Sequence, residues 1–282
     1  MKNKTGKITK ILVPVDFSEC SKNALEVAGS LVRKLGSSLV VFHAYHVPVP
    51  AQQYGSAPLH YDIGDLYAEE SDKLKIFVRN TKGLHDIPIE KHVSPSFAHD
   101  GILSKVENED VDLIVMGTTG ASGLKDVFIG SITYGIIRES KVPVLSIPPN
   151  TTLESGIERV AFGVDCKTIE NEACLKPIIA LAEAFDADTH IIHVSDKRSL
   201  NINQSCVVRD LNAKMLKLHP SFHFEVNSSV EEGLENYVDK NNIDILVLLP
   251  RHHNMITRIL QKGNTRKVAS KGEIPMLTLI GG

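Results

Sequence analysis

Short runs of consecutive apolar residues alternate along the chain with longer amphipathic stretches. The runs show little polar–apolar alternation, as in Leu113, Ile114, Val115 and Met116, which is typical of strands buried on both faces of a parallel sheet. Right-handed crossovers between such strands produce a doubly wound, Rossmann-like α/β domain. For the first half, the pattern predicts strands at 9–16, 38–44, 87–93, 111–116 and 142–147, and helices at 19–36, 65–82, 97–108 and 130–139.

The second half of the chain repeats this pattern. Segments 159–165, 191–194, 244–249 and 274–280 match strands of the first half, and Asp165 takes the place of Asp16. The offset between matched positions falls from about 150 to about 132 residues, so the first half carries extra residues, mostly in a loop at 45–65. A loop of this length is more often functional or mobile than without any role. We therefore expect two domains in tandem, residues 1–150 and 151–282.

Composition narrows the class of protein. The chain has 282 residues, of which 42% are hydrophobic and 23% charged, which is ordinary for a soluble globular protein. The net charge of −3 gives no electrostatic reason to expect nucleic-acid binding, and no apolar run reaches the roughly 18 residues of a membrane span. The four cysteines form no C-x-x-C pair and indicate reduced, mostly buried thiols, so we expect a cytoplasmic protein.

A glycine-rich loop provides the main candidate for binding chemistry. Gly117 and Gly120 follow the apolar run at 113–116, and Gly130 precedes an apolar helical pattern. Glycines let a backbone approach an anion closely, and the first N–H groups of a helix point toward it, so this order indicates a phosphate site. Asp16, Ala44 and Gly117 all follow or end predicted strands, where ligands of doubly wound sheets bind. The spacing is neither that of Walker A nor G-x-G-x-x-G.

The spacing G-x-x-G, nine residues, G-S resembles the ATP-binding motif of the universal stress protein family. The opening strand 11–16, the second strand 40–44 and the last strand 141–147 are similar to those of the same family. The resemblance implies a domain that binds ATP. The sequence leaves open whether ADP, AMP or a cyclic nucleotide competes for the same site. Because the family commonly pairs two domains through their last strands, it also implies that the tandem chain packs as an intrachain pseudo-dimer, which could dimerise again.

The resemblance implies roles for residues at the base and sugar. Asp16 is expected near the ribose or phosphates, where it could help to hold Mg²⁺. Pro14 and Val15 would line the adenine. Ala44 would bind adenine through its backbone, and Met116 would pack near the sugar and base. An alternative for Asp16 is that it only caps the first helix.

The same resemblance assigns the phosphates to Gly117, Gly120, Gly130 and Ser131, with Thr133 nearby. The Ser131 hydroxyl would add a donor at the helix N-terminus, where it could also be the N-cap. The alternative is that Gly117 and Gly120 are plain turn residues. His43 follows a buried strand, and we expect it to be a packed core histidine.

The motif is lost in the second half. Leu249 and His252 stand where Gly117 and Gly120 stand in the first half, so we expect no ATP binding there in the manner of the family. The basic segment from Arg251 to Lys267 leaves three alternatives open, which are a pocket for another anion, a metal site, and a degenerate loop on a scaffold.

No catalytic constellation is apparent, since the chain has no H-E-x-x-H motif and no nucleophile elbow. The sequence favours an ATP-binding regulatory or stress-response protein with an unknown protein partner. One alternative is a slow ATP hydrolase or a protein that phosphorylates itself at Ser131 or a nearby hydroxyl. Another is a non-catalytic scaffold that binds proteins or a different small ligand.

Overall fold

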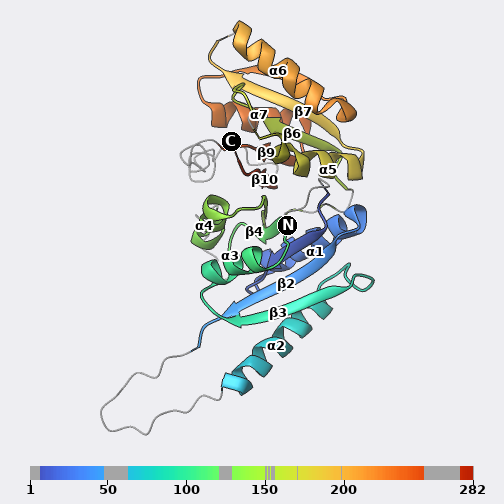
Figure 1. The fold of residues 1–282 in the computed structure, drawn as a ribbon, viewed down its shortest axis with the longest axis vertical. Coiled ribbons are helices and arrows are strands. Elements are labelled where there is room, and N and C mark those ends of the chain that lie inside the picture. Colours follow the sequence, from blue (N-terminus) through green and yellow to red (C-terminus); the bar gives the residue numbers. More distant parts are fainter. Residues whose placement is uncertain are drawn as a thin grey trace, which may run out of the picture.

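A computed structural model describes residues 7–47, 63–120, 129–149, 151, 153, 156–169, 171–197, 199–250 and 274–281. The first half alternates strands and helices in the order that the apolar pattern predicts (Figure 1). Its elements are β1 (Lys10–Pro14), α1 (Glu19–Leu35), β2 (Ser38–Tyr45), α2 (Ile63–Asn80), β3 (Ile89–Pro95), α3 (Ala98–Asn108), β4 (Leu113–Gly117), α4 (Ser131–Glu139) and β5 (Val144–Ile147).

The second half is built on the same plan. Its elements are β6 (Arg159–Gly163), the 3₁₀ turn η1 (Glu172–Leu175), α5 (Lys176–Phe185), β7 (Asp188–Ser195), α6 (Ile202–Lys214), the 3₁₀ turn η2 (Leu216–Leu218), β8 (Ser221–Val226), α7 (Val230–Asn241), β9 (Ile245–Leu248) and β10 (Met276–Thr278).

All these strands form one ten-stranded sheet, in the order β3-β2-β1-β4-β5-β10-β9-β6-β7-β8. Every neighbouring pair is parallel except β5 and β10, which run antiparallel where the two halves meet. In Figure 1 the two halves lie end to end, with β10 next to the first half. The predicted fold, two doubly wound parallel sheets packed as a pseudo-dimer, is confirmed.

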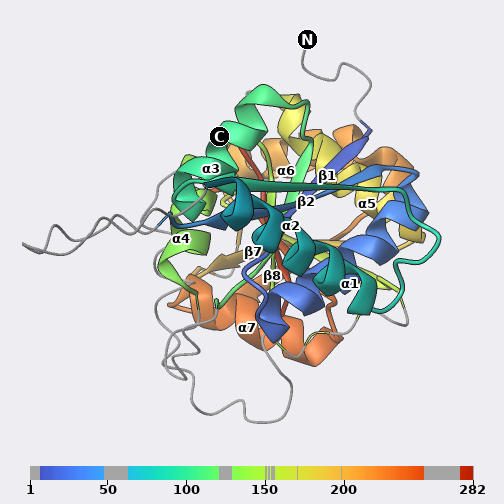
Figure 2. The same ribbon diagram turned by 90° about the horizontal axis from the view of Figure 1, so that it is seen from below.

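Two apolar layers cover the sheet, and each contains residues from both halves. Residues of α1, α2, α5 and α6 pack on one face, and residues of α3, α4 and α7 pack on the other. Seen along the sheet, α1 and α5 lie on one side and α3 and α4 on the other (Figure 2). Strands covered on both faces explain why their sequences are continuously apolar.

Matched side chains anchor the two halves in the same way. The Asp112 carboxylate accepts hydrogen bonds from the N–H groups of Thr9 and Lys10 at 2.7 and 3.1 Å. In the second half, the Asp244 carboxylate accepts from the corresponding backbone N–H groups of Glu158 and Arg159 at 2.8 and 2.9 Å. Asp112 thus holds the start of β1 beside the start of β4, and Asp244 holds the start of β6 beside the start of β9.

His43 is a core histidine, as its position predicts. It is 9% exposed, and its Nδ1 lies 2.8 Å from the Val15 carbonyl oxygen. His193 makes the same contact with the Val164 carbonyl oxygen at 2.9 Å. Both imidazoles therefore hold the turn after the first strand of their half.

Three of the four cysteines are buried, as the composition predicts. Cys20, Cys166 and Cys174 are buried and Cys206 is exposed, and none of the four is part of a disulfide. Over the part of the chain that the structure describes, no helix combines the length and apolar character needed to cross a membrane.

A cluster of His190, His223 and Tyr237 fills the space between α7 and the strands β7 and β8. The two imidazoles stack with centroids 4.9 Å apart, and His190 Nδ1 lies 2.7 Å from the Tyr237 hydroxyl. Burial lowers the pKa of both histidines, and the neighbouring His223 lowers the pKa of His190 further. Burial also raises the pKa of Tyr237 to about 12. The cluster is therefore built for neutral rings.

We predict that acidification weakens the second half through this cluster. A histidine whose pKa is lower in the folded than in the unfolded state favours folding above the unfolded pKa of about 6.5, and this contribution is lost as the pH falls from that value through the lower pKa of the folded state. His223→Phe, which keeps an aromatic ring in the stack, should flatten the loss of urea midpoint between about pH 7.5 and about pH 5.5. An equally steep loss in the variant would contradict the prediction.

Candidate functional site

The glycine loop lies at the carboxyl ends of β1 and β4, where the doubly wound sheet places its ligand crevice. Gly117 ends β4, and α4 begins at Ser131. Residues 121–128 of the loop lie outside the described part. The residues on both sides of that gap meet, because the Gly130 N–H donates to the Thr118 carbonyl oxygen at 2.7 Å. The loop is thus closed at its base.

Where the loop closes, Gly120 and Gly130 have no side chains, and this leaves space beside the backbone. A Cβ on Gly130 would lie 3.6 Å from the Thr118 carbonyl oxygen and 3.9 Å from the Gly120 nitrogen. A Cβ on Gly120 would lie only 2.8 Å from Asp16 Oδ2. The structure therefore brings Asp16, Gly120 and Gly130 together, although more than 100 residues separate the first from the others. The arrangement is a bare-backbone cradle with one carboxylate at its edge.

The start of α4 differs from the sequence prediction. Gly130 is the N-cap, with extended backbone at φ −65° and ψ 156°, and no side chain caps the helix. The interpretation of Ser131 as an N-cap is wrong, because Ser131 is already the first helical residue and is exposed. Without a side-chain cap, the first N–H groups of α4 are oriented to meet an anion.

Asp16 is not the cap of α1. That cap is Ser18, whose Oγ accepts from the Ser21 N–H at 3.1 Å. Asp16 Oδ1 instead accepts from the N–H and hydroxyl of Ser18, at 3.1 and 2.5 Å. β1 ends at Pro14, and Phe17 adopts a left-handed φ of 64°. This turn leaves the Asp16 carboxylate exposed at the mouth of the cradle.

Two threonines beside the loop have different tasks. Thr133 is buried, and its hydroxyl donates to the Gly117 carbonyl oxygen at 2.8 Å, so it holds α4 against the end of β4. Thr118 is 5% exposed, and its Oγ1 has no hydrogen-bond partner among the described residues. Sequence reasoning missed Thr118. Its position directly after Gly117 in a glycine-rich loop was the available signal.

The residues predicted at the base and sugar divide between the two faces of the sheet. Met116 and Ala44 belong to the layer beneath α3 and α4, and Pro14 lies on the same face by strand alternation. The Val15 side chain is buried in the opposite layer, so it does not line a site with Pro14. Met116 is 5% exposed and is largely a core residue.

Gly117 is required by packing. A Cβ there would lie 2.7 Å from the Cys20 sulfur and 3.1 Å from the Cys20 backbone, so the first turn of α1 rests directly on the end of β4. Cys20 is buried in this contact, with its Sγ 3.6 Å from the Ile147 carbonyl oxygen. Both facts make Cys20 a structural thiol.

The second half fills the corresponding position. Leu249, the counterpart of Gly117, is 7% exposed and belongs to the apolar core. The predicted basic segment, including His252, lies within residues 251–273, outside the described part. Over the residues that can be compared, a buried side chain stands where the first half has bare backbone.

Comparisons with known proteins agree with this organisation. Residues 7–148 match the model of the universal stress protein family. The chain is 27% identical over 151 residues to the universal stress protein MJ0577 of Methanocaldococcus jannaschii, covering 49% of this chain and 93% of that protein. It is 30% identical over 151 residues to the universal stress protein Sll1388 of Synechocystis, covering 49% and 96%. A universal stress protein structure from Archaeoglobus fulgidus superposes on 99% of both chains, with a TM-score of 0.69 and 20% identity.

We predict that substitutions at Gly117 and at Gly130 have different effects on stability, because only Gly117 is tightly packed. Gly117→Ala should lower the free energy of unfolding by about 1–3 kcal/mol, because the new Cβ collides with Cys20. Gly130→Asn should leave stability unchanged or slightly higher, because asparagine is a better N-cap than glycine and φ is normal there. Urea unfolding of both variants checks this. A neutral Gly117→Ala would show that α1 can move away from β4.

Proposed function

The chain belongs to the universal stress protein family, and from this and the geometry of the crevice we propose that its first half binds ATP at the carboxyl ends of β1 and β4. The observation that carries the proposal is the cradle formed by Gly120, Gly130 and Thr118. Its backbone is bare, its helix start has no side-chain cap, and a buried threonine hydroxyl there has no partner among the described residues. These features suit a group rich in hydrogen-bond acceptors, and phosphate is such a group.

The position of Asp16 favours a nucleotide bound together with Mg²⁺. Its carboxylate lies beside Gly120, so a bare phosphate chain in the cradle would meet a negative charge at close range. Mg²⁺ is commonly held by one or two carboxylates and by the phosphates of the nucleotide, and it would turn this repulsion into a bridge. In this proposal Asp16 contributes one carboxylate, and the first N–H groups of α4, beginning with that of Ser131, bind the phosphates, while the Gly130 N–H keeps its bond to the Thr118 carbonyl oxygen.

The base is proposed to lie toward the ends of β2 and β3. Pro14 and Ala44 share the face of the sheet that leads there, and Ala44 is only partly buried. Beyond them, the rings of His46 and Phe97 lie with centroids 6.0 Å apart, and Phe97 is 71% exposed. An exposed aromatic ring at this end of the sheet offers a surface for a planar base.

Nucleotide occupancy would then serve regulation. A ligand changes the shape or partner affinity of a protein only if it binds two states with different affinity. The cradle joins β1, β4 and α4, and α4 reaches α3 through His99 and Glu139, whose side chains lie 3.5 Å apart. Closure of α4 on the phosphates is the proposed difference between the two states. The second half is proposed as the scaffold on which the first half is held.

We predict that wild-type protein binds MgATP at one site per chain in isothermal titration. Gly130→Asp should weaken binding by at least about tenfold, since it places a carboxylate in the cradle where phosphate is proposed. Gly130→Asn is the matched control, because it adds a side chain of the same size and the same capping ability without the charge. It should retain more of the affinity than Gly130→Asp.

The outcomes of the titration are distinct. Equal loss in the aspartate and asparagine variants would indicate that bulk rather than charge matters, and would count against a phosphate in the cradle. Two sites per chain would show that the second half also binds nucleotide. A wild-type chain that binds no MgATP would overturn the proposal and favour a scaffold that acts through protein partners. Steady-state ATP hydrolysis that Gly130→Asp abolishes would show that the site is also catalytic.

A further inference from the structure

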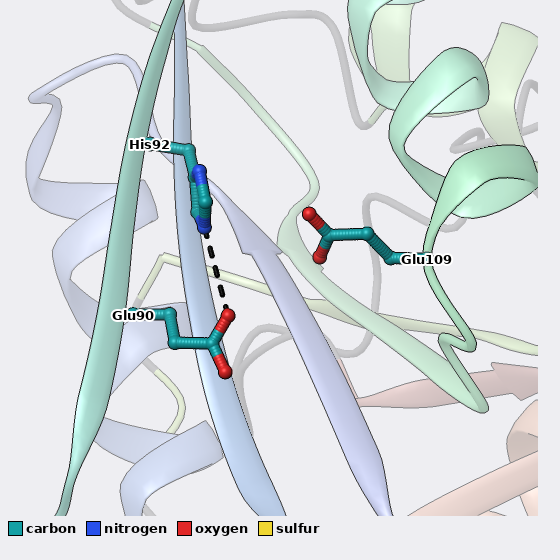
Figure 3. Close-up of side chains that lie close together, drawn as sticks. All are labelled: Glu90, His92 and Glu109. Atoms are coloured by element: carbon teal, nitrogen blue, oxygen red, sulfur yellow. Dashed lines mark ion pairs between the residues drawn. The ribbon is translucent and has the colours of Figure 1, made fainter.

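Three side chains with metal-binding chemistry meet on the face of the sheet under α3, where α3 ends and β3 begins. Glu90 and His92 lie on β3, and Glu109 follows the last residue of α3 (Figure 3). Lys10, the first residue of β1, lies beside them, whereas the glycine loop lies beyond the other end of that strand. This cluster is therefore separate from the proposed ATP site.

The geometry of the cluster follows from the register of β3. Glu90 and His92 are two residues apart, so their side chains leave the strand on the same face. That face is the one covered by α3, since their partners in β2 are Val40 and Phe42 of the layer under α3. His92 Nε2 lies 3.6 Å from Glu90 Oε2, and each of the three residues offers an atom within 4.8 Å of the others.

The two oxygens of Glu109 have different surroundings. Oε1 is paired with Lys105 Nζ at 2.6 Å, one helical turn away. Oε2 is buried from solvent and accepts no hydrogen bond from any described residue, and it lies 4.0 Å from Lys10 Nζ. A buried carboxylate oxygen without a donor is costly. In Figure 3 this carboxylate points toward His92 and Glu90.

We propose that Glu90, His92 and Glu109 bind a divalent transition-metal ion of the Zn²⁺ type. One imidazole nitrogen and two carboxylate oxygens are ligands that Zn²⁺ accepts, whereas Mg²⁺ and Ca²⁺ prefer oxygen alone. Two ligands of a tetrahedral Zn²⁺ lie about 3.4 Å apart when each bond is about 2.1 Å. The separation of His92 and Glu90 is close to this value, and Glu109 Oε2 would complete a three-ligand site with one position left for water.

Such an ion would tie the edge of the sheet to its centre. β3 is the edge strand and pairs only with β2 among the described strands. Glu109 lies just before β4, and β4 is next to β1, the central strand of the first half. A metal that binds the folded chain but not the unfolded one raises the thermal midpoint, and the stabilisation grows with the logarithm of the ratio of metal concentration to Kd. The site would therefore act as a clip that holds an otherwise exposed edge strand.

The test is a Zn²⁺ titration of the full-length chain without an affinity tag, in competition with a chromophoric chelator. Wild type should show one site per chain that His92→Ala and Glu109→Gln each weaken by at least about tenfold. His85→Ala is the matched control, since it removes an exposed imidazole shortly before β3 and should leave this site unchanged. Lys105→Gln should tighten binding, because it removes the cation that competes for Glu109.

A second measurement keeps the result independent of folding defects. Zn²⁺ should raise the thermal midpoint of wild type and of His85→Ala, but not that of His92→Ala. The proposal is overturned if wild type binds no more Zn²⁺ than His92→Ala does, because the remaining histidines and Cys206 would then account for all binding. It is also overturned if Lys105→Gln weakens the site. None of these outcomes depends on whether the first half binds ATP.

Discussion

The antiparallel pairing of β5 with β10 is the interaction on which the rest of the molecule depends. Leu145 lies opposite Leu277 in this pairing, and both are fully buried. Without it, each half would present an apolar edge strand to solvent, which is a template for aggregation. With it, two five-stranded sheets become one, each covering layer runs across both halves, and α1 contacts α5 over the junction. The second half, which has Leu249 where the first half has Gly117, therefore still completes the fold.

The two halves show how one framework can keep its structure and change its surface. Both retain the aspartate that anchors the first strand and the histidine that holds the following turn, through Asp112 and His43 in one half and Asp244 and His193 in the other. They diverge at the carboxyl end of the fourth strand, where Gly117 lets α1 approach and Leu249 fills the core. The two halves thus differ in side-chain volume at this one position. The half with glycine has the proposed nucleotide crevice, and the half with leucine is proposed to be the scaffold.

Two regions of the first half's sheet have different chemistry. At the carboxyl ends, Gly120 and Gly130 leave the backbone without side chains, α4 begins without a side-chain cap, and the carboxylate of Asp16 lies at the edge. On the face under α3, near the start of β3, carboxylates and an imidazole converge on a position suited to a cation. α3 links the two regions, since its first turn holds His99 against Glu139 of α4 and Glu109 follows its last residue. One helix therefore contacts α4 near its first turn and leads to the metal-binding cluster at its end.

Periodicity alone determined the strands, the helices, the repeat and the position of the glycine loop, because these depend on local patterns of burial. The strand ends of the first half differ from the prediction by up to two residues. β1 ends at Pro14, after which the chain turns through Phe17, and β3 spans Ile89–Pro95 rather than 87–93. The tertiary structure decided what depends on contacts between distant segments. It showed that Gly117 rests on Cys20, that Val15 and Pro14 face opposite layers, and that Gly130 rather than Ser131 is the N-cap. It also showed that Glu109 lies close to Glu90 and His92. The sequence could not predict this contact, because no periodic pattern relates residues of a strand to the residue at the end of the next helix.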